Sequence, residues 1–144
     1  MVLGAVKMKK GTTQLIDFTV RSDERGSLIA LESLSDQVPF DIKRVYYSFG
    51  TTPNAVRGKH AHYNLKEILI CTSGSCDVDI FDGVVRKNYH LDTPTKGLFI
   101  DGFIWREMKN FTSDCVLMVL ASDHYDETDY IRDYNEFLYF LSNH

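Results

Sequence analysis

The chain has 144 residues, 44% of them hydrophobic and 12% aromatic, and 16 Lys and Arg against 20 Asp and Glu give a net charge of −4. This composition predicts one folded domain over residues 1–144 and excludes a disordered, collagen-like or disulfide-scaffold chain. The acidic balance argues against general binding to nucleic acid or to an anionic membrane surface. No apolar run approaches the roughly 20 residues of a membrane-spanning helix, and the first ten residues lack the pattern of a signal peptide.

Ten short segments enriched in β-branched and aromatic residues predict strands, each bounded by turn residues. Such strands, with no helices between them, predict an all-β sandwich or barrel. Asp82-Gly83 predicts a hairpin turn with positive φ at both central positions. In chain order the predicted strands are TQLIDFTV, GSLIALES, IKRVYYSF, GKHAHYN, EILICTSG, CDVDIF, VVRKNYHL, GLFIDGF, IWREMKNF and CVLMVLAS.

The spacing of apolar residues changes from the alternation of strands to a helical period only at the end of the chain. From Asp126 to Leu141, apolar side chains recur at helical spacing, beginning with Tyr130 and Tyr134. We expect one amphipathic helix over this stretch, packed on the outside of the β domain, with Asp126 or Thr128 as its N-cap.

The three cysteines, Cys71, Cys76 and Cys115, form no CxxC pair, and each lies in or beside a predicted strand. Buried free thiols in a reducing cytoplasm are the favoured interpretation. A catalytic cysteine assisted by a histidine is the alternative.

Two histidines carry the clearest chemical signal. His60 and His62 are two positions apart on a predicted strand, so they share a face, and imidazole suits proton transfer near neutral pH. A solvated pair without chemistry is the alternative. Together with Glu67 and Gly74, however, the two histidines match the first half of the cupin motif, which is found on small β-barrels.

In metal-binding cupins, both histidines and the glutamate are ligands, and a later strand supplies another histidine. Here Pro94 and Gly97 of the later segment are in place, but Arg106 occupies the expected histidine position. Two histidines and Glu67 could still hold Fe(II) as a facial triad. A permanent cation opposes a bound dication, so we favour a pocket without metal or other cofactor.

Basic residues are concentrated around the histidines. Arg44 opens one predicted strand, Arg57 and Lys59 flank His60, and Arg25 and Arg106 come from elsewhere in the chain. Most such charges in proteins are simply solvated. In an acidic chain, arginines grouped beside a proton-transfer pair favour an anionic ligand, because guanidinium matches the geometry of phosphate.

At the level of the whole chain, the sequence resembles the dTDP-4-keto-6-deoxyglucose 3,4-ketoisomerases. This family implies a cupin (jelly-roll) barrel with a C-terminal helix, and a homodimer that exchanges its N-terminal strand. It also implies metal-independent isomerisation of a dTDP-linked 4-keto-6-deoxy sugar, on the route to 3-amino-3,6-dideoxy sugars of surface polysaccharides such as lipopolysaccharide O-antigen. The resemblance rests on ERGSLIALE (24–32), VPFDIKRVYYSF (38–49), RGKHAH (57–62), KGLFIDGFIWREM (96–108) and CVLMVLASDHYDETDYIRDY (115–134).

The resemblance also implies residue roles. His60 and His62 match the family's paired histidines and would transfer the proton, although their individual duties stay open. Glu67 departs from a common family form that has an amide here. An ionised Glu67 would raise the pKa of the neighbouring imidazole or hold its tautomer.

The family's ligand is expected to contact a second set of residues. Arg44 and Arg57 match arginines that would hold the diphosphate, and Tyr46 and Trp105 are weaker candidates for lining the pocket. Tyr47 is a further aromatic on which a base could stack.

Residues at two positions relate to the configuration of the product at C4. Arg25 resembles the galacto-forming type, whereas Arg106 resembles the gluco-forming type, so the configuration stays open. The aminotransferase that acts next also stays open.

Three alternative functions remain at this point. One is a dTDP-sugar 3,5-epimerase-like cupin, the second is a metal-dependent cupin dioxygenase, and the third is a sugar-sensing cupin module without catalysis.

Overall fold

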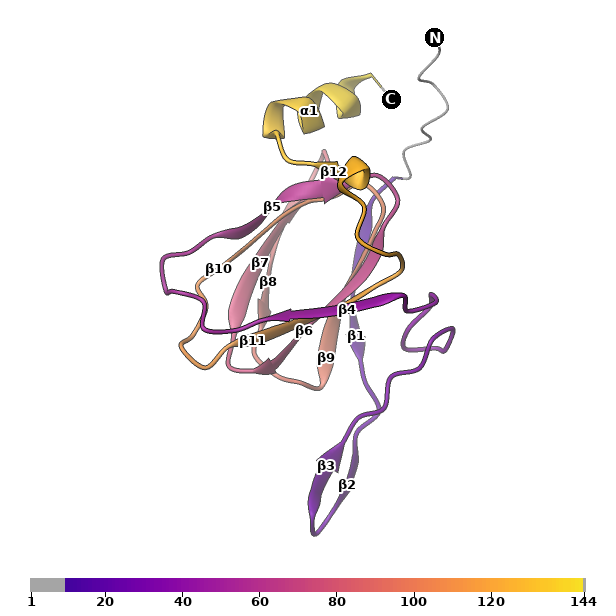
Figure 1. Cartoon of the computed structure of the whole chain (residues 1–144), viewed down its shortest axis with the longest axis vertical. Coiled ribbons are helices and arrows are strands. Elements are labelled where there is room, and N and C mark those ends of the chain that lie inside the picture. Colours follow the sequence, from indigo (N-terminus) through magenta and orange to yellow (C-terminus); the bar gives the residue numbers. More distant parts are fainter. Residues whose placement is uncertain (1–9, 144) are drawn as a thin grey trace.

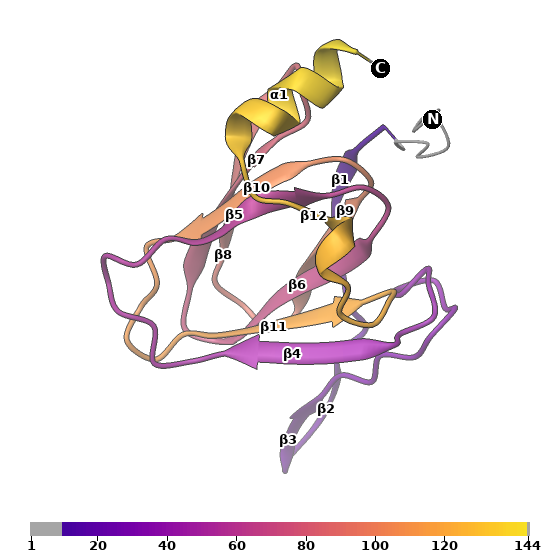
Figure 2. The same cartoon turned by 45° about the horizontal axis from the view of Figure 1, so that its top comes forward.

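Two five-stranded antiparallel sheets face each other and enclose the core, as Figures 1 and 2 show. The computed structural model describes residues 10–143. One sheet has the strand order β1-β9-β6-β11-β4 and the other β12-β5-β10-β7-β8, while β2 and β3 form a separate hairpin. This arrangement, with one C-terminal helix, confirms the expected all-β cupin fold.

Most elements follow one another with short connections, and the longest connection, over residues 29–43, joins β3 to β4. The strands are β1 (Thr12–Asp17), β2 (Arg21–Asp23), β3 (Gly26–Leu28), β4 (Arg44–Ser48), β5 (Arg57–His62), β6 (Lys66–Ser73), β7 (Cys76–Phe81), β8 (Arg86–Leu91), β9 (Lys96–Asp101), β10 (Trp105–Lys109), β11 (Val116–Ala121) and β12 (Tyr130–Ile131). A 3-10 turn covers Glu127–Asp129, and the helix α1 covers Tyr134–Ser142.

Strand alternation separates two apolar layers. On β6, Leu69 and Cys71 belong to the core between the sheets, whereas Ile68 and Ile70 belong to a second cluster with Phe18. Side chains that alternate along a strand face opposite sides of the sheet. Both faces of the β1-containing sheet are therefore covered, one by the opposite sheet and the other in part by the segment that follows β1.

Most of the predicted strands are shorter in the structure, among them one in each of the two hairpins. β7 and β8 pair as the hairpin expected from Asp82-Gly83, but β8 begins two residues later than predicted, because the Asp82 carboxylate accepts hydrogen bonds from the backbone N–H groups of Val84 and Val85. Among the turn residues only Gly83 has positive φ. The predicted strand GSLIALES is confined to β3, which lies in the hairpin that projects from the body in Figure 1.

The prediction of one helix from Asp126 to Leu141 is wrong in its first half. Asp126 caps only the 3-10 turn, and β12 then pairs with β5 through Tyr130↔His62. The helix α1 begins at Tyr134, with the Asp133 side chain as N-cap. Local capping and strand pairing therefore override the helical period between Asp126 and Asp133.

The helix α1 packs on the outside of the β12-containing sheet, as predicted (Figure 2). Phe137 is fully buried and stacks on Phe103, with ring centroids 4.7 Å apart. Ala61, Trp105 and Ile131 complete this outer cluster. Among the described residues, no helix has the length and apolar character needed to cross a membrane.

We expect Gly74→Ala to destabilise the fold more than Gly50→Ala does. Both glycines have φ near +60°, at +64° and +62°, so alanine pays the left-handed penalty of about 1–2 kcal/mol at either position. A Cβ at Gly74 would also lie 2.4 Å from Thr112 Oγ1 and 2.7 Å from the backbone N of Cys115, whereas Gly50 has open space. Overpacking adds about 1–3 kcal/mol at Gly74. Urea unfolding of both variants checks this, and equal losses would contradict it.

Candidate active site

Several of the predicted site residues line a cavity of about 410 Å³ between β4 and β5. These strands belong to opposite sheets, as Figures 1 and 2 show, so the cavity lies between the two sheets. Its lining includes Arg44, Tyr46, Arg57, His60 and Tyr130.

A β-bulge in β5 brings Arg57 and His60 to the same side. Arg106 pairs with His60, but the next residue of β10 pairs with Gly58, so Lys59 is an extra residue on β5. Gly58 and Lys59 both have positive φ, at +81° and +54°. Residues three apart on a regular strand face opposite ways, and one extra residue restores them to one face. The bulge therefore directs both Arg57 and His60 into the cavity.

His60 is poised to meet a ligand. Its side chain lines the cavity, the residue is 8% exposed, and neither ring nitrogen has a hydrogen-bond partner within residues 10–143. Burial and the nearby Arg106 guanidinium lower its pKa from the ordinary 6.5 to about 4. The imidazole is therefore neutral at pH 7 and can accept a proton.

Polar and aromatic neighbours fix the position of the His62 ring. Its Nδ1 lies 3.1 Å from Asp129 Oδ2, while its Nε2 lies 3.9 Å from Glu67 Oε1. The ring contacts His60 at a centroid distance of 4.7 Å and Tyr130 at 4.3 Å. Burial and Arg106 lower the pKa of His62 to about 2, so this imidazole is also neutral. Asp129 accordingly accepts a hydrogen bond from Nδ1–H, which leaves Nε2 as the basic nitrogen.

The expected effect of Glu67 on His62 is corrected by this geometry. Glu67 does favour the charged imidazole, but burial and Arg106 outweigh it, so the pKa falls rather than rises. The tautomer of His62 is fixed by Asp129, which makes the hydrogen bond that we expected from Glu67.

Glu67 and Arg106 form a buried ion pair, since both side chains are only 1% exposed. The Arg106 Nη1 donates to Glu67 Oε1, and the Tyr46 hydroxyl donates to Oε2 at 2.7 Å. Both carboxylate oxygens are thus engaged, and a guanidinium lies where a dication would be required. The set of His60, His62 and Glu67 therefore does not fit a facial-triad metal site.

Three arginines add positive charge around the cavity. Arg44, Arg57 and Arg132 all line it, and Arg44 lies over the rings of Tyr46 and Tyr125, at 5.1 and 5.7 Å from their centroids. Guanidinium groups converging beside aromatic rings suit a ligand that carries both phosphate and a planar base.

Comparison with known proteins identifies the family. The family model described as FdtA: WxcM-like, C-terminal matches residues 11–142. A curated TDP-4-oxo-6-deoxy-alpha-D-glucose-3,4-oxoisomerase from Aneurinibacillus thermoaerophilus is 48% identical over 129 residues, which cover 90% of this chain and 92% of the relative. The chain belongs to the sugar-nucleotide 3,4-ketoisomerase family.

Solved structures of 3,4-ketoisomerases agree with this assignment. One from Helicobacter canadensis matches with a TM-score of 0.87 at 48% identity, covering 90% of this chain and 97% of the other. A histidine-to-asparagine mutant from Thermoanaerobacterium thermosaccharolyticum, in complex with TDP-4-keto-6-deoxyglucose, matches with a TM-score of 0.87 at 40% identity, covering 91% and 94%. A 4-keto-6-deoxy sugar epimerase from Streptomyces spheroides, at 17% identity and a TM-score of 0.69, shares the fold alone.

Two residues predicted for the ketoisomerase site lie elsewhere in this chain. Trp105 packs under α1 on the outer face of its sheet, with its ring centroid 5.2 Å from that of Tyr134. Its neighbour Arg106 faces inward, and adjacent strand residues cannot share a face, so the prediction for Trp105 is wrong. Arg25 lies in the turn of the β2–β3 hairpin, 83% exposed and paired with Asp23, outside the cavity of its own chain.

Four residues that the structure places at or next to the ketoisomerase cavity were not predicted from the sequence. Tyr125, Tyr130 and Arg132 line the cavity, and Asp129 contacts His62. Three of the four fall in the stretch that was expected to be a helix, and Tyr125 directly precedes it. The one signal available was the specificity of the segment 115–134 for this family.

Acid should weaken the fold through the two buried histidines. Their folded-state pKa values, about 4 and about 2, lie below the ordinary 6.5, so the unfolded chain binds more protons as the pH falls. Their contribution is fully present above pH 6.5 and declines from there toward pH 4, by up to about 1.4 kcal/mol per pH unit for each histidine. Urea unfolding at pH 7 and pH 5 measures the loss. His60→Asn should make the pH dependence shallower, and an unchanged slope would contradict this assignment.

Proposed function

We propose that this chain converts dTDP-4-keto-6-deoxy-D-glucose to a dTDP-3-keto-6-deoxyhexose, as one cupin domain acting without a metal. The observation that carries the proposal is the position of His60, which lines a cavity together with three arginines and whose two buried ring nitrogens have no hydrogen-bond partner among residues 10–143. Membership of the 3,4-ketoisomerase family supports the same reaction. The product enters the synthesis of 3-amino-3,6-dideoxy sugars for surface polysaccharide.

The chemistry requires a proton to move between adjacent carbons. The C4 ketone acidifies the hydrogen on C3, and its removal by a neutral imidazole forms an enediolate. The hydroxyl proton on O3 then passes to O4 and a proton returns to C4, which leaves the carbonyl at C3 and a hydroxyl at C4, so the atoms balance and no redox partner is needed. General acid–base catalysis of this kind contributes about 10²- to 10⁴-fold. His60 and His62 take these roles, and Nε2 is the nitrogen with which His62 acts.

The same arrangement accounts for ligand binding and for the neutral state of the two imidazoles. Arg44, Arg57 and Arg132 hold the diphosphate, and the aromatic rings at the cavity mouth accept the thymine base. Tyr46 and Arg106 keep Glu67 in place behind His62. Burial, together with the guanidinium of Arg106, lowers the pKa of both imidazoles and keeps them neutral, which is the state that a general base needs.

Asp129→Asn should lower kcat by about 10- to 100-fold, a loss seen where an outer partner that orients an imidazole is removed. An amide at this position can present its N–H₂ to Nδ1 and so favour the wrong tautomer of His62. KM should change little, because Asp129 does not line the larger cavity. Steady-state kinetics test this, with Asp123→Asn as the matched control. Asp123, Asp129 and His62 all line a second, smaller pocket of about 170 Å³, but Asp123 makes no hydrogen bond to His62 in the described part of the chain. Equal kinetics for the two variants would contradict the role of Asp129.

The active form in this proposal is a cytoplasmic homodimer that exchanges its N-terminal strand. Two features support it: the β2–β3 hairpin projects from the body with every residue exposed (Figure 1), and the edge strand β4 carries the exposed Val45 and Tyr47. In such a dimer, Arg25 is free to act at the site of the partner subunit. Light scattering that gives the mass of one chain would overturn the dimer.

The reaction is tested by incubation with dTDP-4-keto-6-deoxyglucose and a 3-aminotransferase, followed by NMR of the trapped amino sugar. A 3-amino-3,6-dideoxy sugar is expected, and its couplings give the configuration at C4. A product whose amino group is absent from C3 would overturn the proposal. Chelator-treated enzyme serves as the control and should keep its activity, whereas a dioxygenase of the metal-dependent type would lose it.

A further inference from the structure

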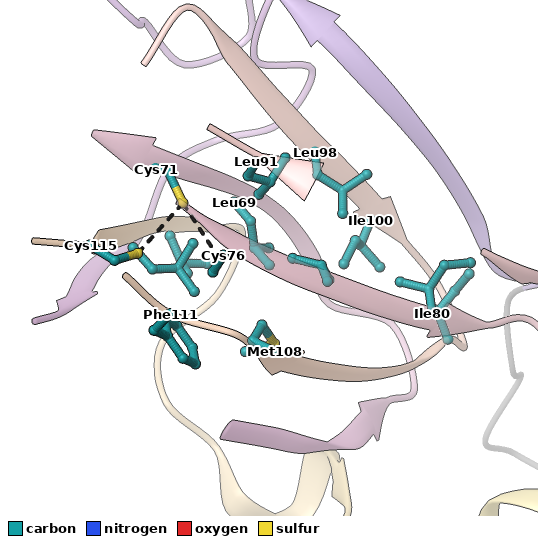
Figure 3. Close-up of a cluster of buried hydrophobic side chains, with 14 residues drawn as sticks. Leu69, Cys71, Cys76, Ile80, Leu91, Leu98, Ile100, Met108, Phe111 and Cys115 are labelled. Carbon is teal, nitrogen blue, oxygen red and sulfur yellow. Dashed lines mark hydrogen bonds between the residues drawn. The ribbon is translucent and has the colours of Figure 1, made fainter. Parts of the chain in front are cut away.

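Three thiols meet in the buried hydrophobic cluster inside the barrel (Figure 3). Cys71 Sγ lies 3.5 Å from Cys76 Sγ and 3.8 Å from Cys115 Sγ. The three residues are 0%, 0% and 2% exposed, all are free thiols, and they are the only cysteines in the sequence. The sequence interpretation of buried free thiols is therefore confirmed, but their gathering at one point was not predicted.

Both sheets contribute to this cluster. Cys71 lies on β6 of one sheet, Cys76 begins β7 of the other, and Cys115 directly precedes β11. Glu67 of the active site, Leu69 and Cys71 alternate along β6, so the thiols lie about 13 Å from Glu67 along the strand. An aliphatic layer thus separates the cluster from the proposed chemistry.

The spacing of the sulfurs suits a single soft ion. All three Sγ atoms lie within 4.8 Å of one another. Bonds of about 2.3 Å to thiolate sulfur, the length found for zinc, place the sulfurs of one ion about 3.8 Å apart. Small rotations of the side chains would therefore be enough to bring all three sulfurs onto one centre.

The apolar surroundings determine which ionic charge is compatible with three thiolates at this site. The thiols belong to a buried cluster of hydrophobic residues that also includes Leu69, Val78 and Phe111. The hydrogen bond to Cys76 and burial raise the pKa of Cys71, and burial raises that of Cys115 to about 12. Three thiolates around a dication would leave a net negative charge in a dry core, which is costly. A trivalent ion with three thiolates is neutral.

We propose that Cys71, Cys76 and Cys115 form a binding site for trivalent arsenic. Arsenous acid, As(OH)₃, condenses with three neutral thiols to give As(SR)₃ and three water molecules. Three As–O and three S–H bonds break, while three As–S and three O–H bonds form. Arsenic keeps its oxidation state, and neither the reactants nor the products carry charge.

Native mass spectrometry tests this site directly. The protein is unfolded and refolded with arsenous acid, so that burial does not block access, and a phosphine reductant replaces competing thiols. The wild-type chain should gain the mass of one arsenic less three hydrogens, and its thermal midpoint should rise because the ligand binds the folded state. The readout does not depend on enzyme activity, so it is independent of the proposed function.

Cys115→Ala is the matched variant. The two remaining thiols can replace only two of the three hydroxyl groups of arsenous acid. The third hydroxyl stays on arsenic, so the variant gains the mass of one water molecule more than the wild type. Circular dichroism confirms that the variant folds. The proposal is overturned if refolded wild type gains no arsenic, or if its bound arsenic retains the hydroxyl as in the variant. It is also overturned if the chain binds zinc and no arsenic when both are present during refolding.

Discussion

His60→Asn should lower kcat by about 10²- to 10⁴-fold while the affinity for TDP stays nearly unchanged. Asparagine keeps a polar side chain of similar reach but cannot accept a proton at neutral pH. In the proposed function the arginines make the diphosphate contacts, so binding should not depend on the imidazole. His62→Asn should have an effect of the same order, because the proposal gives both rings a part in the proton transfer. Coupled turnover assays with the 3-aminotransferase and calorimetric titration with TDP measure the two quantities separately.

His90→Asn provides the control for both substitutions. The His90 side chain is 56% exposed and hydrogen-bonds to Asp77 on β7, away from the cavity. The His90→Asn variant should turn over the sugar nucleotide at the rate of the wild type. If the His60 and His62 variants also keep full turnover, the acid–base assignment is wrong.

Glu67→Gln should cost about 3–5 kcal/mol of unfolding free energy, because it leaves the buried Arg106 guanidinium without its countercharge. The side chains of both partners are only 1% exposed, so water cannot take the place of the carboxylate. A double variant, Glu67→Gln with Arg106→Met, removes both charges and should recover much of the loss.

Asp79→Asn is the surface counterpart of this substitution. Asp79 pairs with Lys109 at 2.6 Å, and the two side chains are 37% and 42% exposed. An exposed pair contributes about 0–1 kcal/mol, so this variant should unfold almost like the wild type. Urea unfolding of all three variants tests the buried pair, and a Glu67→Gln loss no larger than that of Asp79→Asn would contradict it.

Two departures from the family pattern turn out to be one feature. The sequence shows Glu67 where an amide is common and Arg106 where a histidine is expected, and it offers no reason to connect them. In the structure they form the ion pair behind His62. The pairing was hidden because β6 and β10 belong to different sheets, and the residues are 39 positions apart.

The sequence predicted most of the strands and the paired histidines because both follow from period-two alternation and local turn chemistry. The same alternation, applied to β10, would have excluded Trp105, since Arg106 beside it faces inward. Asp129 could not be predicted in this way. Its contact with His62 depends on β12, a strand of two residues whose pairing with β5 has no signature in the local sequence.

The account depends on imidazoles that move a proton between neighbouring carbons of one bound sugar. NMR of dTDP-4-keto-6-deoxyglucose incubated with the enzyme in D₂O follows each carbon-bound hydrogen separately. The wild type should exchange the hydrogen at C3 while C5 keeps its own, and the His60→Asn variant should exchange neither. Deuterium at C5, or full exchange at C3 in the variant, would show that a different reaction or a different base operates in this cavity.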